Sequence, residues 1–230
     1  MNITVSKPTA VNLPDELQLS EFISQYRQVM MLYESAIQCV SSRLDIISKE
    51  SKICNRRTPI RAVTSRLKEP QSIYRKLRQR GYPLTLESIK ENLNDVAGIR
   101  VICEYIRDAY TIRDALLVGD IIKLIQEKDY IKEPKPNGYR SLHLIVDVPV
   151  LLSEGERHVR CEIQIRTTAM DSWAALEHNL RYKKNLANDE KTDRKLKLCA
   201  SMLAESDSMM QDIAEDLGFF RQPDGQRLLK

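Results

Sequence analysis

Several features that define whole classes of protein are missing from this sequence. The five cysteines are widely spaced and form no C-x-x-C pair, which argues against a thiolate zinc site or a disulfide framework and favours buried, inert thiols. No apolar run approaches the roughly 18 residues that cross a bilayer, and the first residues lack a secretory signal. Seven glycines and nine prolines in 230 residues are too few for a disordered or collagen-like chain. We therefore expect a cytoplasmic globular protein without membrane association.

Charge is small in sum but uneven along the chain. The 36 basic and 32 acidic residues give a net charge of +4. The segment from Arg56 to Arg80, however, sets nine basic residues against the single acid Glu69, a local balance of +8. A concentrated positive field favours a polyanionic ligand such as a nucleic acid or a nucleoside polyphosphate. A solvated basic face is the alternative interpretation.

Two apolar stripes with helical spacing predict a long helix near each end of the chain. They can pair with each other across the core or meet copies of themselves in an oligomer. The first stripe comprises Leu19, Ile23, Tyr26, Met30, Tyr33, Ile37, Val40, Leu44 and Ile47, and the second comprises Leu196, Cys199, Leu203, Ser206, Met210, Ile213 and Leu217.

Between these helices, runs of β-branched and aliphatic residues predict strands. They occupy residues 62–68, 97–105, 140–148 and 158–166. The segment Ile121–Ile125 fits a fifth strand or a helix. Helical patterns lie between some of the strands, so we expect an α+β fold in which a mixed sheet of about five strands is flanked by helices.

Polar residues alternate with apolar ones in two of these strands. In residues 158–166 the apolar face must be buried, which leaves a polar row suited to ligand handling, although a solvent-facing strand gives the same pattern. Tyr139, Ser141 and His143 likewise share a face near the start of the strand at Arg140. The polar row of the former strand consists of His158, Arg160, Glu162, Gln164 and Arg166.

A tight loop is predicted at Lys135-Pro-Asn-Gly138, just before Tyr139. Such a loop exposes backbone N–H groups, while Lys135 adds a cation and Tyr139 an aromatic platform. Together these groups can hold a purine ring and its phosphates. A plain hairpin turn is the alternative.

Cations gather where a strand is expected to meet a helix. Arg66 and Lys68 project from one face of the strand end, and Pro70 suits the first position of a helix. Ser72 and Lys76, four residues apart, then share a helical face near that helix's N-terminus. Free N–H groups and the helix dipole favour phosphate there.

Two carboxylates are candidate metal ligands. Asp95 precedes the strand at 97–105, and Glu162 lies on another strand. Mg²⁺ usually takes one or two carboxylates together with phosphate oxygens and water, so this pair suffices. For Asp95, an N-cap role is the competing explanation.

Six segments, taken in order, resemble the synthetase domain of the RelA/SpoT family, and the short chain resembles the family's small alarmone synthetases. The resemblance covers about residues 55–185. The segments are Arg66-x-Lys68-x-x-x-Ser72-x-x-x-Lys76, Asp95-x-x-Gly-Ile-Arg100, Lys128-Asp-Tyr-Ile, Lys135-Pro-Asn-Gly-Tyr-Arg-Ser-Leu-His143, Glu162-Ile-Gln-Ile-Arg-Thr167 and Trp173-Ala-Ala-Leu-Glu-His178.

The resemblance implies a nucleotidyltransferase-like fold and a GTP diphosphokinase that, with Mg²⁺, moves pyrophosphate from ATP to the 3′-hydroxyl of GDP or GTP in stress signalling. Asp95 and Glu162 would bind the metal, and Glu162 is also the candidate general base. Tyr139 would stack on guanine. The ATP-binding residues would be Arg66 and Arg100, flanking adenine, with Lys68, Ser72 and Lys76 on the phosphates. The remaining acceptor residues would be Lys128, Lys135, Asn137, His143 and Gln164.

The resemblance also implies one synthetase domain over residues 1–230. The two apolar stripes predict helical extensions at 15–50 and 190–217, and the residues at 221–230 are expected to form a loose tail. No hydrolase or regulatory domain is expected, because the histidines His143, His158 and His178 all lie inside the match and none precedes Asp. A homotetramer is implied as well.

Two alternatives stay open on sequence grounds. The same transfer can use another acceptor, such as an RNA end or an adenosine nucleotide, or the chain can be a non-catalytic RNA-binding module. Glu177 and His178 receive no chemical role. Packing is expected for the helix face formed by Ala169, Trp173, Leu176 and Leu180.

Overall fold

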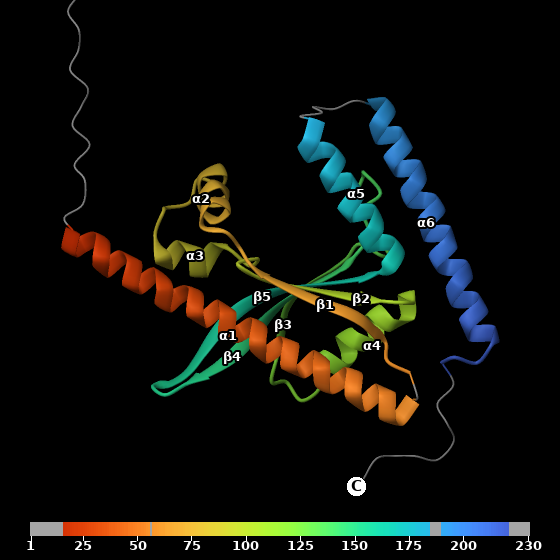
Figure 1. Cartoon of the computed structure of the whole chain (residues 1–230), viewed down its shortest axis with the longest axis horizontal. Coiled ribbons are helices and arrows are strands. Elements are labelled where there is room, and N and C mark those ends of the chain that lie inside the picture. Colours follow the sequence, from red (N-terminus) through yellow and green to blue (C-terminus); the bar gives the residue numbers. More distant parts are fainter. Residues whose placement is uncertain (1–15, 56, 185–189, 221–230) are drawn as a thin grey trace, which may run out of the picture.

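The computed structural model describes residues 16–55, 57–184 and 190–220, and it shows a twisted sheet flanked by helices (Figure 1). The tail predicted at residues 221–230 lies outside this part of the chain. The helices are α1 (Glu16–Asn55), α2 (Pro70–Gln79), α3 (Leu86–Asn92), α4 (Ile106–Leu117), α5 (Thr168–Lys184) and α6 (Glu190–Asp216). The strands are β1 (Ile60–Leu67), β2 (Ala97–Cys103), β3 (Lys123–Asp129), β4 (Leu142–Leu152) and β5 (Gly155–Thr167).

The five strands form one mixed sheet in the order β1-β2-β5-β4-β3. Only the central pair β2 and β5 is parallel, and the other neighbours are antiparallel. The α+β prediction is confirmed, as are the long helices at both ends. The fifth strand lies later than expected, at Lys123–Asp129, and β4 begins at Leu142 rather than near Arg140. The backbone N–H of Tyr130 donates to the carbonyl of Ser141 just outside these strands.

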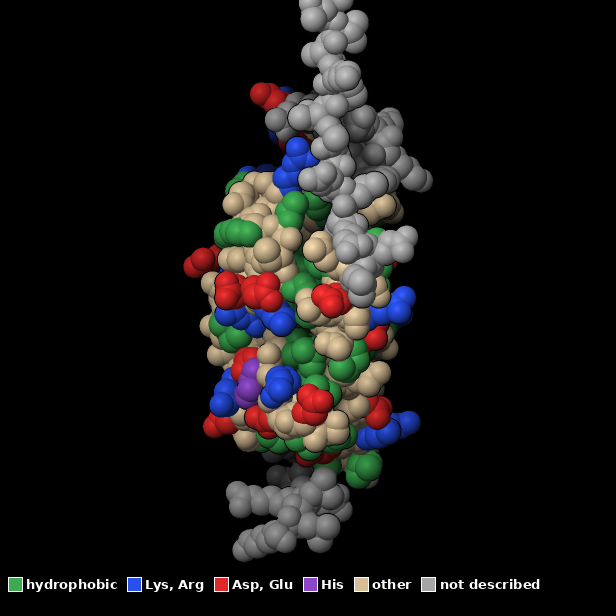
Figure 2. Space-filling view, turned by 90° about the vertical axis from the view of Figure 1, so that its left-hand side faces the viewer, with side chains coloured by type: hydrophobic (Ala, Val, Ile, Leu, Met, Phe, Trp, Pro, Cys, Tyr) green, Lys and Arg blue, Asp and Glu red, His purple; other side chains and the backbone are tan. Residues whose placement is uncertain are grey.

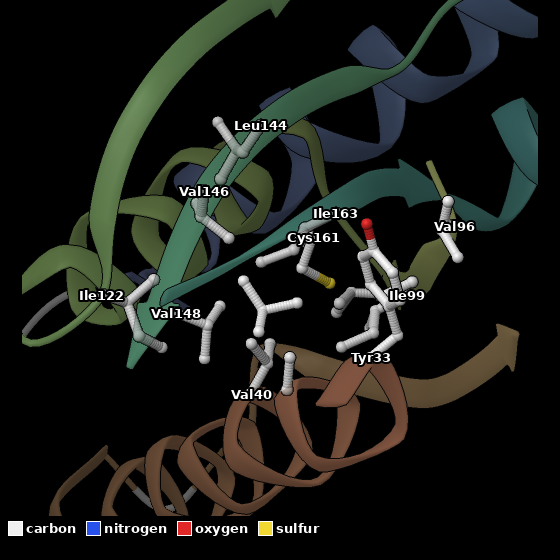
Figure 3. Packing of buried hydrophobic residues seen from close by; sticks show 14 of the residues in the cluster. Tyr33, Val40, Val96, Ile99, Ile122, Leu144, Val146, Val148, Cys161 and Ile163 are labelled. Carbon is white, nitrogen blue, oxygen red and sulfur yellow. The ribbon is translucent and has the colours of Figure 1, made fainter. Parts of the chain in front are cut away.

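One face of the sheet is apolar and is covered by α1 and α4. Tyr33 and Val40 of α1 point into a cluster with Ile99, Cys161 and Val148 from three strands (Figure 3). Alternation along each strand places these side chains on a single face, so burying them leaves the polar side chains on the other. The core therefore fixes which face of the sheet can carry chemistry.

The first predicted stripe is buried only along part of its length. Residues from Met30 to Ile47 contribute to the core, whereas Leu19 and Ile23 are 47% and 41% exposed. In Figure 1 the N-terminal end of α1 extends past the sheet, which explains why helical spacing continues there without burial.

The second predicted stripe is largely wrong. Met210, Ile213 and Leu217 are exposed, and the buried positions of α6 are Ala200 and Ala214. Small side chains let α6 pack closely against α5 and α4. The buried face of α6 therefore lacks large apolar residues, and a search for such residues at helical spacing does not find it. Helix α1 thus packs mainly on the sheet and α6 mainly on α5, while both helices also contact α4.

Most cations of the segment from Arg56 to Arg80 lie on the surface of β1 and α2, but Arg57 belongs to the fold. Its guanidinium donates to Asp108 at 2.9 and 2.5 Å and lies 5.1 Å from the ring centre of Phe220, which follows α6. A buried, bidentate pair of this kind is structural. Arg56 lies outside the described residues.

Two further expectations meet the structure here. All five cysteines are free thiols, but only Cys103 and Cys161 are buried, where burial raises the pKa of each thiol and keeps it inert. The prediction of five buried thiols is therefore wrong for the other three. Among the described residues, no helix is both long enough and apolar enough to cross a membrane.

The packing of α1 on the sheet generates a stability prediction. Leu44 is fully buried, so Leu44→Ala should lower the free energy of unfolding by about 2–5 kcal/mol through lost burial and a cavity. Ile53, on the same helix, is 72% exposed, so Ile53→Ala should change it by less than about 0.5 kcal/mol. Denaturant unfolding measures both, and equal effects would contradict the packing of α1.

Candidate active site

Strand pairing brings the predicted site residues together in two rows on the polar face of the sheet. Residues directly opposite each other on neighbouring strands point to the same side. One row runs across all five strands as Thr64, Arg100, Gln164, His143 and Lys128. The neighbouring row runs as Arg66, Gly98, Glu162, Ile145 and Gln126.

A pocket opens where the two rows meet β1 and β2. It unites four residues predicted to hold ATP or metal, and its full lining is Thr64, Ser65, Arg66, Asp95, Gly98, Ile99, Arg100, Glu162 and Gln164. A Cβ added to Gly98 would meet Arg66 at an ordinary van der Waals distance of 3.6 Å. The absence of a side chain at Gly98 therefore leaves space in the pocket.

Asp95 is held by two lysines at the edge of this pocket. Its Oδ2 accepts from Lys68 Nζ at 2.8 Å and Lys76 Nζ at 2.6 Å. Burial favours the neutral acid, but the two ammonium groups outweigh it and lower the pKa of Asp95. The other oxygen, Oδ1, is buried without a hydrogen-bond partner in the described structure. Asp95 lies between α3 and β2, and Thr85 caps α3, so the N-cap explanation is wrong.

Glu162 lies at the centre of the polar face. Its Oε2 accepts from Gln164 Nε2 at 3.0 Å, and its Oε1 lies 3.4 Å from His143 Nδ1. Burial raises the pKa of Glu162, but the contacts with His143 and Gln164 outweigh it and leave this pKa below its ordinary value. The side chain is therefore an ionised carboxylate at neutral pH, and it can bind a cation or accept a proton.

The donor set of the pocket fits a small hard cation. Asp95 and Glu162 both line it, and Asp95 Oδ1 has no hydrogen-bond partner in the described structure. The described residues contain no group of three or more His, Cys, Asp and Glu side chains that could hold a metal. Two carboxylates with room for substrate oxygens match Mg²⁺ rather than an ion caged wholly by protein.

Beside the pocket, aromatic and cationic side chains surround Tyr139. Its hydroxyl lies 2.7 Å from His143 Nε2 and accepts from Arg166 Nη2 at 2.7 Å. Lys135 Nζ lies 4.6 Å from the Tyr139 ring centre and 4.7 Å from that of Tyr130. The hydroxyl contacts fix the orientation of the Tyr139 ring, and His143 links it to Glu162.

The loop at residues 135–139 forms a tight turn packed against α6. The carbonyl of Lys135 accepts from the N–H of Gly138 at 2.8 Å, and Asn137 Oδ1 accepts from the N–H of Tyr139 at 3.1 Å. Gly138 has φ +91°, and a Cβ there would lie 2.6 Å from the Cβ of Ala200. Only glycine fits this contact. The loop is thus a supported turn on α6 rather than a two-residue hairpin.

Two more of the predicted residues are placed by helix α2 and strand β3. Ser72 is half-buried on α2, one turn before Lys76, and Lys128 is exposed on β3 opposite His143. The first two members of the polar row on β5, His158 and Arg160, contact neighbouring protein groups rather than the pocket. His158 contacts Asp147 and Glu156 near the β4–β5 turn, and Arg160 donates to the carbonyl of Glu91. Charges of both signs are interspersed on the side of the molecule seen in Figure 2.

Sequence reasoning gave no specific role to four residues of this region. Arg166 continues the polar row of β5, so alternation gave a signal for it, and Tyr130 lies within a quoted motif. Asp171 and Glu177 lie on α5, and Glu177 Oε1 accepts from Asn137 Nδ2 at 3.3 Å. The expected packing face of α5 is wrong at Leu176 and Leu180, which are exposed. Among the α5 side chains that the structure describes, Met170 and Trp173 are the buried ones.

The hydroxyl of Tyr139 generates a testable prediction. Tyr139→Phe keeps the ring but deprives His143 and Arg166 of a partner, so the free energy of unfolding should fall by about 1–3 kcal/mol. Tyr74 is exposed on α2, and Tyr74→Phe is the matched control with an expected change below about 0.5 kcal/mol. Thermal or denaturant unfolding measures both changes. A Tyr139→Phe variant as stable as the control would show that these contacts contribute nothing.

Comparison with known proteins agrees with this geometry. Residues 65–187 match the model of a region found in RelA / SpoT proteins. The chain is similar to the GTP pyrophosphokinase YwaC of Bacillus subtilis, with 37% identity over 199 residues that make up 86% of this chain and 95% of the relative. It is also similar to the GTP pyrophosphokinase YjbM of the same organism, with 34% identity, 82% of this chain and 88% of the relative.

Solved structures show the same relationship. Small alarmone synthetase 1 from B. subtilis bound to its product pppGpp matches with a TM-score of 0.76 and 33% identity, covering 84% of this chain and 97% of that one. The same synthetase bound to AMPCPP matches with a TM-score of 0.70 and 28% identity, covering 85% and 98%. On this evidence, the chain belongs to the RelA/SpoT family.

Proposed function

We propose that this protein is a GTP diphosphokinase that transfers the β,γ-pyrophosphate of ATP to the ribose 3′-hydroxyl of GDP or GTP, releasing AMP. The observation that carries the proposal is the position of Glu162. Its carboxylate lies in the pocket with Asp95 and also contacts His143, which holds the Tyr139 ring. Two nucleotides, one in the pocket and one on Tyr139, would meet at this carboxylate.

The donor side suits ATP. Arg66 and Arg100 project from neighbouring strands into the pocket and would flank the adenine ring, because guanidinium groups stack on aromatic faces. Lys68 and Lys76 now neutralise Asp95 and would turn to the ATP phosphates, with Ser72 on the same face of α2. Each lysine would keep an anionic partner, because the phosphate oxygens of ATP would take the place of the Asp95 carboxylate.

Mg²⁺ would be held by Asp95 and Glu162. When bound, it would offset the negative charge of the triphosphate and leave Lys68 and Lys76 free for phosphate oxygens. Asp95 Oδ1 is the oxygen best suited to the metal, because it is buried without a hydrogen-bond partner in the described structure.

The acceptor side suits a guanosine nucleotide. Guanine would stack on Tyr139, and Asn137, His143 and Gln164 offer hydrogen-bonding groups around that ring. Lys135 and Lys128 would meet its phosphates. Both lysines are exposed and therefore able to reach a ligand.

The reaction needs alignment and one proton transfer. The 3′-oxygen attacks the β-phosphorus, the bond from that phosphorus to the oxygen of the α-phosphate breaks, and AMP leaves with that oxygen. The proton of the 3′-hydroxyl passes to Glu162, which is ionised and therefore able to accept it. The product would be guanosine tetra- or pentaphosphate, a signal in the stringent response.

Location and assembly follow from the same proposal. ATP and GTP are cytoplasmic nucleotides, so we place the enzyme in the cytoplasm. We also infer association of copies into a homotetramer. Exposed apolar side chains on both long helices, including Phe22 and Met31 on α1 and Met202 and Met209 on α6, would supply contact surface.

An acceptor panel tests the proposed function. The purified protein is incubated with ATP and Mg²⁺ and, in separate reactions, with GDP, GTP, ADP or a short RNA. AMP release with a matching guanosine 3′-pyrophosphate is expected only with GDP and GTP. Transfer to ADP or RNA alone would replace the acceptor, and salt-sensitive RNA binding without any transfer would indicate a binding module.

Substitution of Glu162 tests the proposed base. Glu162→Gln keeps the size of the side chain but removes its basicity, so kcat should fall about 10²- to 10⁴-fold while AMPCPP binding changes little. Glu205 is exposed on α6, and Glu205→Gln should retain the wild-type kcat. Recovery of Glu162→Gln at high Mg²⁺ would reduce Glu162 to a metal ligand, and an unchanged kcat would remove it from the chemistry.

A further inference from the structure

Asp171, in the first turn of α5, bridges two arginines that belong to different halves of the site. Its Oδ1 accepts from Arg166 Nη1 at 3.0 Å and lies 3.3 Å from Arg100 Nη1. Arg100 lines the pocket proposed for ATP. Arg166 Nη2 donates to the Tyr139 hydroxyl at 2.7 Å. A continuous polar chain therefore runs from the donor pocket through Asp171 to the ring proposed to stack on the acceptor base.

The two arginines depend on Asp171 for both charge and position. The Nε atoms of Arg100 and Arg166 are buried without hydrogen-bond partners in the described structure, so the Nη contacts alone fix the guanidinium planes. Arg166 is only 5% exposed. Two guanidinium groups close together repel each other, and burial strengthens that repulsion. Burial and the charge of Arg166 lower the pKa of Arg100, whereas Asp171 opposes this effect.

Asp171 itself is held on a rigid support. Helix α5 follows β5 directly, and Thr167, at the junction, donates through Oγ1 to Asp207 of α6 at 2.5 Å. Trp173 Nε1 donates to the carbonyl of Leu196 at 2.9 Å, which fixes the next turn of α5 to the same helix. Asp171 lies between these two anchors. Both arginines therefore contact one carboxylate oxygen whose position is fixed by the two anchors.

We propose that Asp171 is a positioning residue that couples the two nucleotide sites. Binding of ATP in the pocket then strengthens binding of the acceptor at Tyr139, and binding of the acceptor strengthens binding of ATP. The inference rests on the proposed function, which assigns Arg100 to the donor and Tyr139 to the acceptor. A nucleotide that orders one arginine spares the second nucleotide part of the cost of ordering the other. By linkage, each ligand must then strengthen binding of the other by the same factor.

Binding measurements on the full chain test this coupling. The affinity for GDP is measured by calorimetry with Mg²⁺, in the absence and in the presence of saturating AMPCPP, whose methylene bridge prevents transfer. In the wild type we expect AMPCPP to tighten GDP binding by about 5-fold or more, within the usual range of coupling between sites. In Asp171→Ala we expect a factor below about 2, because the bridge is gone.

A matched control separates coupling from general damage. Asp212 is exposed on α6, and Asp212→Ala should keep the wild-type coupling factor. If Asp171→Ala does not fold, Asp171→Asn takes its place, since it removes the charge and keeps the size. A merely structural role would lower the melting temperature and leave the coupling factor unchanged.

The outcomes distinguish this inference from the function on which it rests. Coupling lost in the Asp171 variant and kept in the control supports the inference. Coupling that survives in the Asp171 variant, or is absent from a wild type that converts GDP to product, overturns it and leaves the proposed function intact. A wild type that forms no product with GDP or GTP overturns the proposed function first.

Discussion

The parallel pairing of β2 with β5 is the constraint on which the rest of the site depends. Its register sets Gly98 opposite Glu162 and Arg100 opposite Gln164, in the middle of a sheet whose other pairs are antiparallel. Asp95, two residues before β2, is thereby brought to the pocket that Glu162 lines. A shift of one residue in this pairing would turn the polar row of β5 into the core. The same β2–β5 register therefore buries the apolar face and aligns the site residues.

Burial on one side of the sheet organises the charge on the other. Helices α1 and α4 cover the apolar face, which leaves Glu162, Gln164 and Arg166 as a rank on the opposite face of β5. Each of these side chains has partners within the rank or beside it. Unsatisfied hydrogen-bonding atoms in the site lie on Asp95, Arg100 and Arg166, whose Oδ1 and Nε atoms are buried without partners in the described structure. Under the proposed function, a polyphosphate and a cation would supply what those atoms lack.

The sequence predicted the sheet and most of the site because both depend on local patterns. Alternation along residues 158–166 identified the polar row, and the motif order brought in Asp95 and Tyr139. Prediction from the sequence failed where residues far apart in the chain contact each other. The spacing of residues in α6 does not reveal that Ala200 packs against Gly138, because small residues do not stand out in an apolar helical pattern. No local pattern pairs Asp171 with Arg100 and Arg166, which lie on two different strands. Arg57 looked like ligand-binding charge until its partner Asp108 was known.

A structure of the protein with AMPCPP, GDP and Mg²⁺ tests the central claim most directly, namely that Glu162 lies where two nucleotides meet. The account predicts a metal between Asp95 and Glu162, guanine on Tyr139, and the 3′-oxygen of GDP about 3–3.5 Å from the β-phosphorus and within hydrogen-bonding reach of Glu162. A structure in which either nucleotide lies elsewhere, with Glu162 in contact with neither nucleotide nor metal, would contradict it.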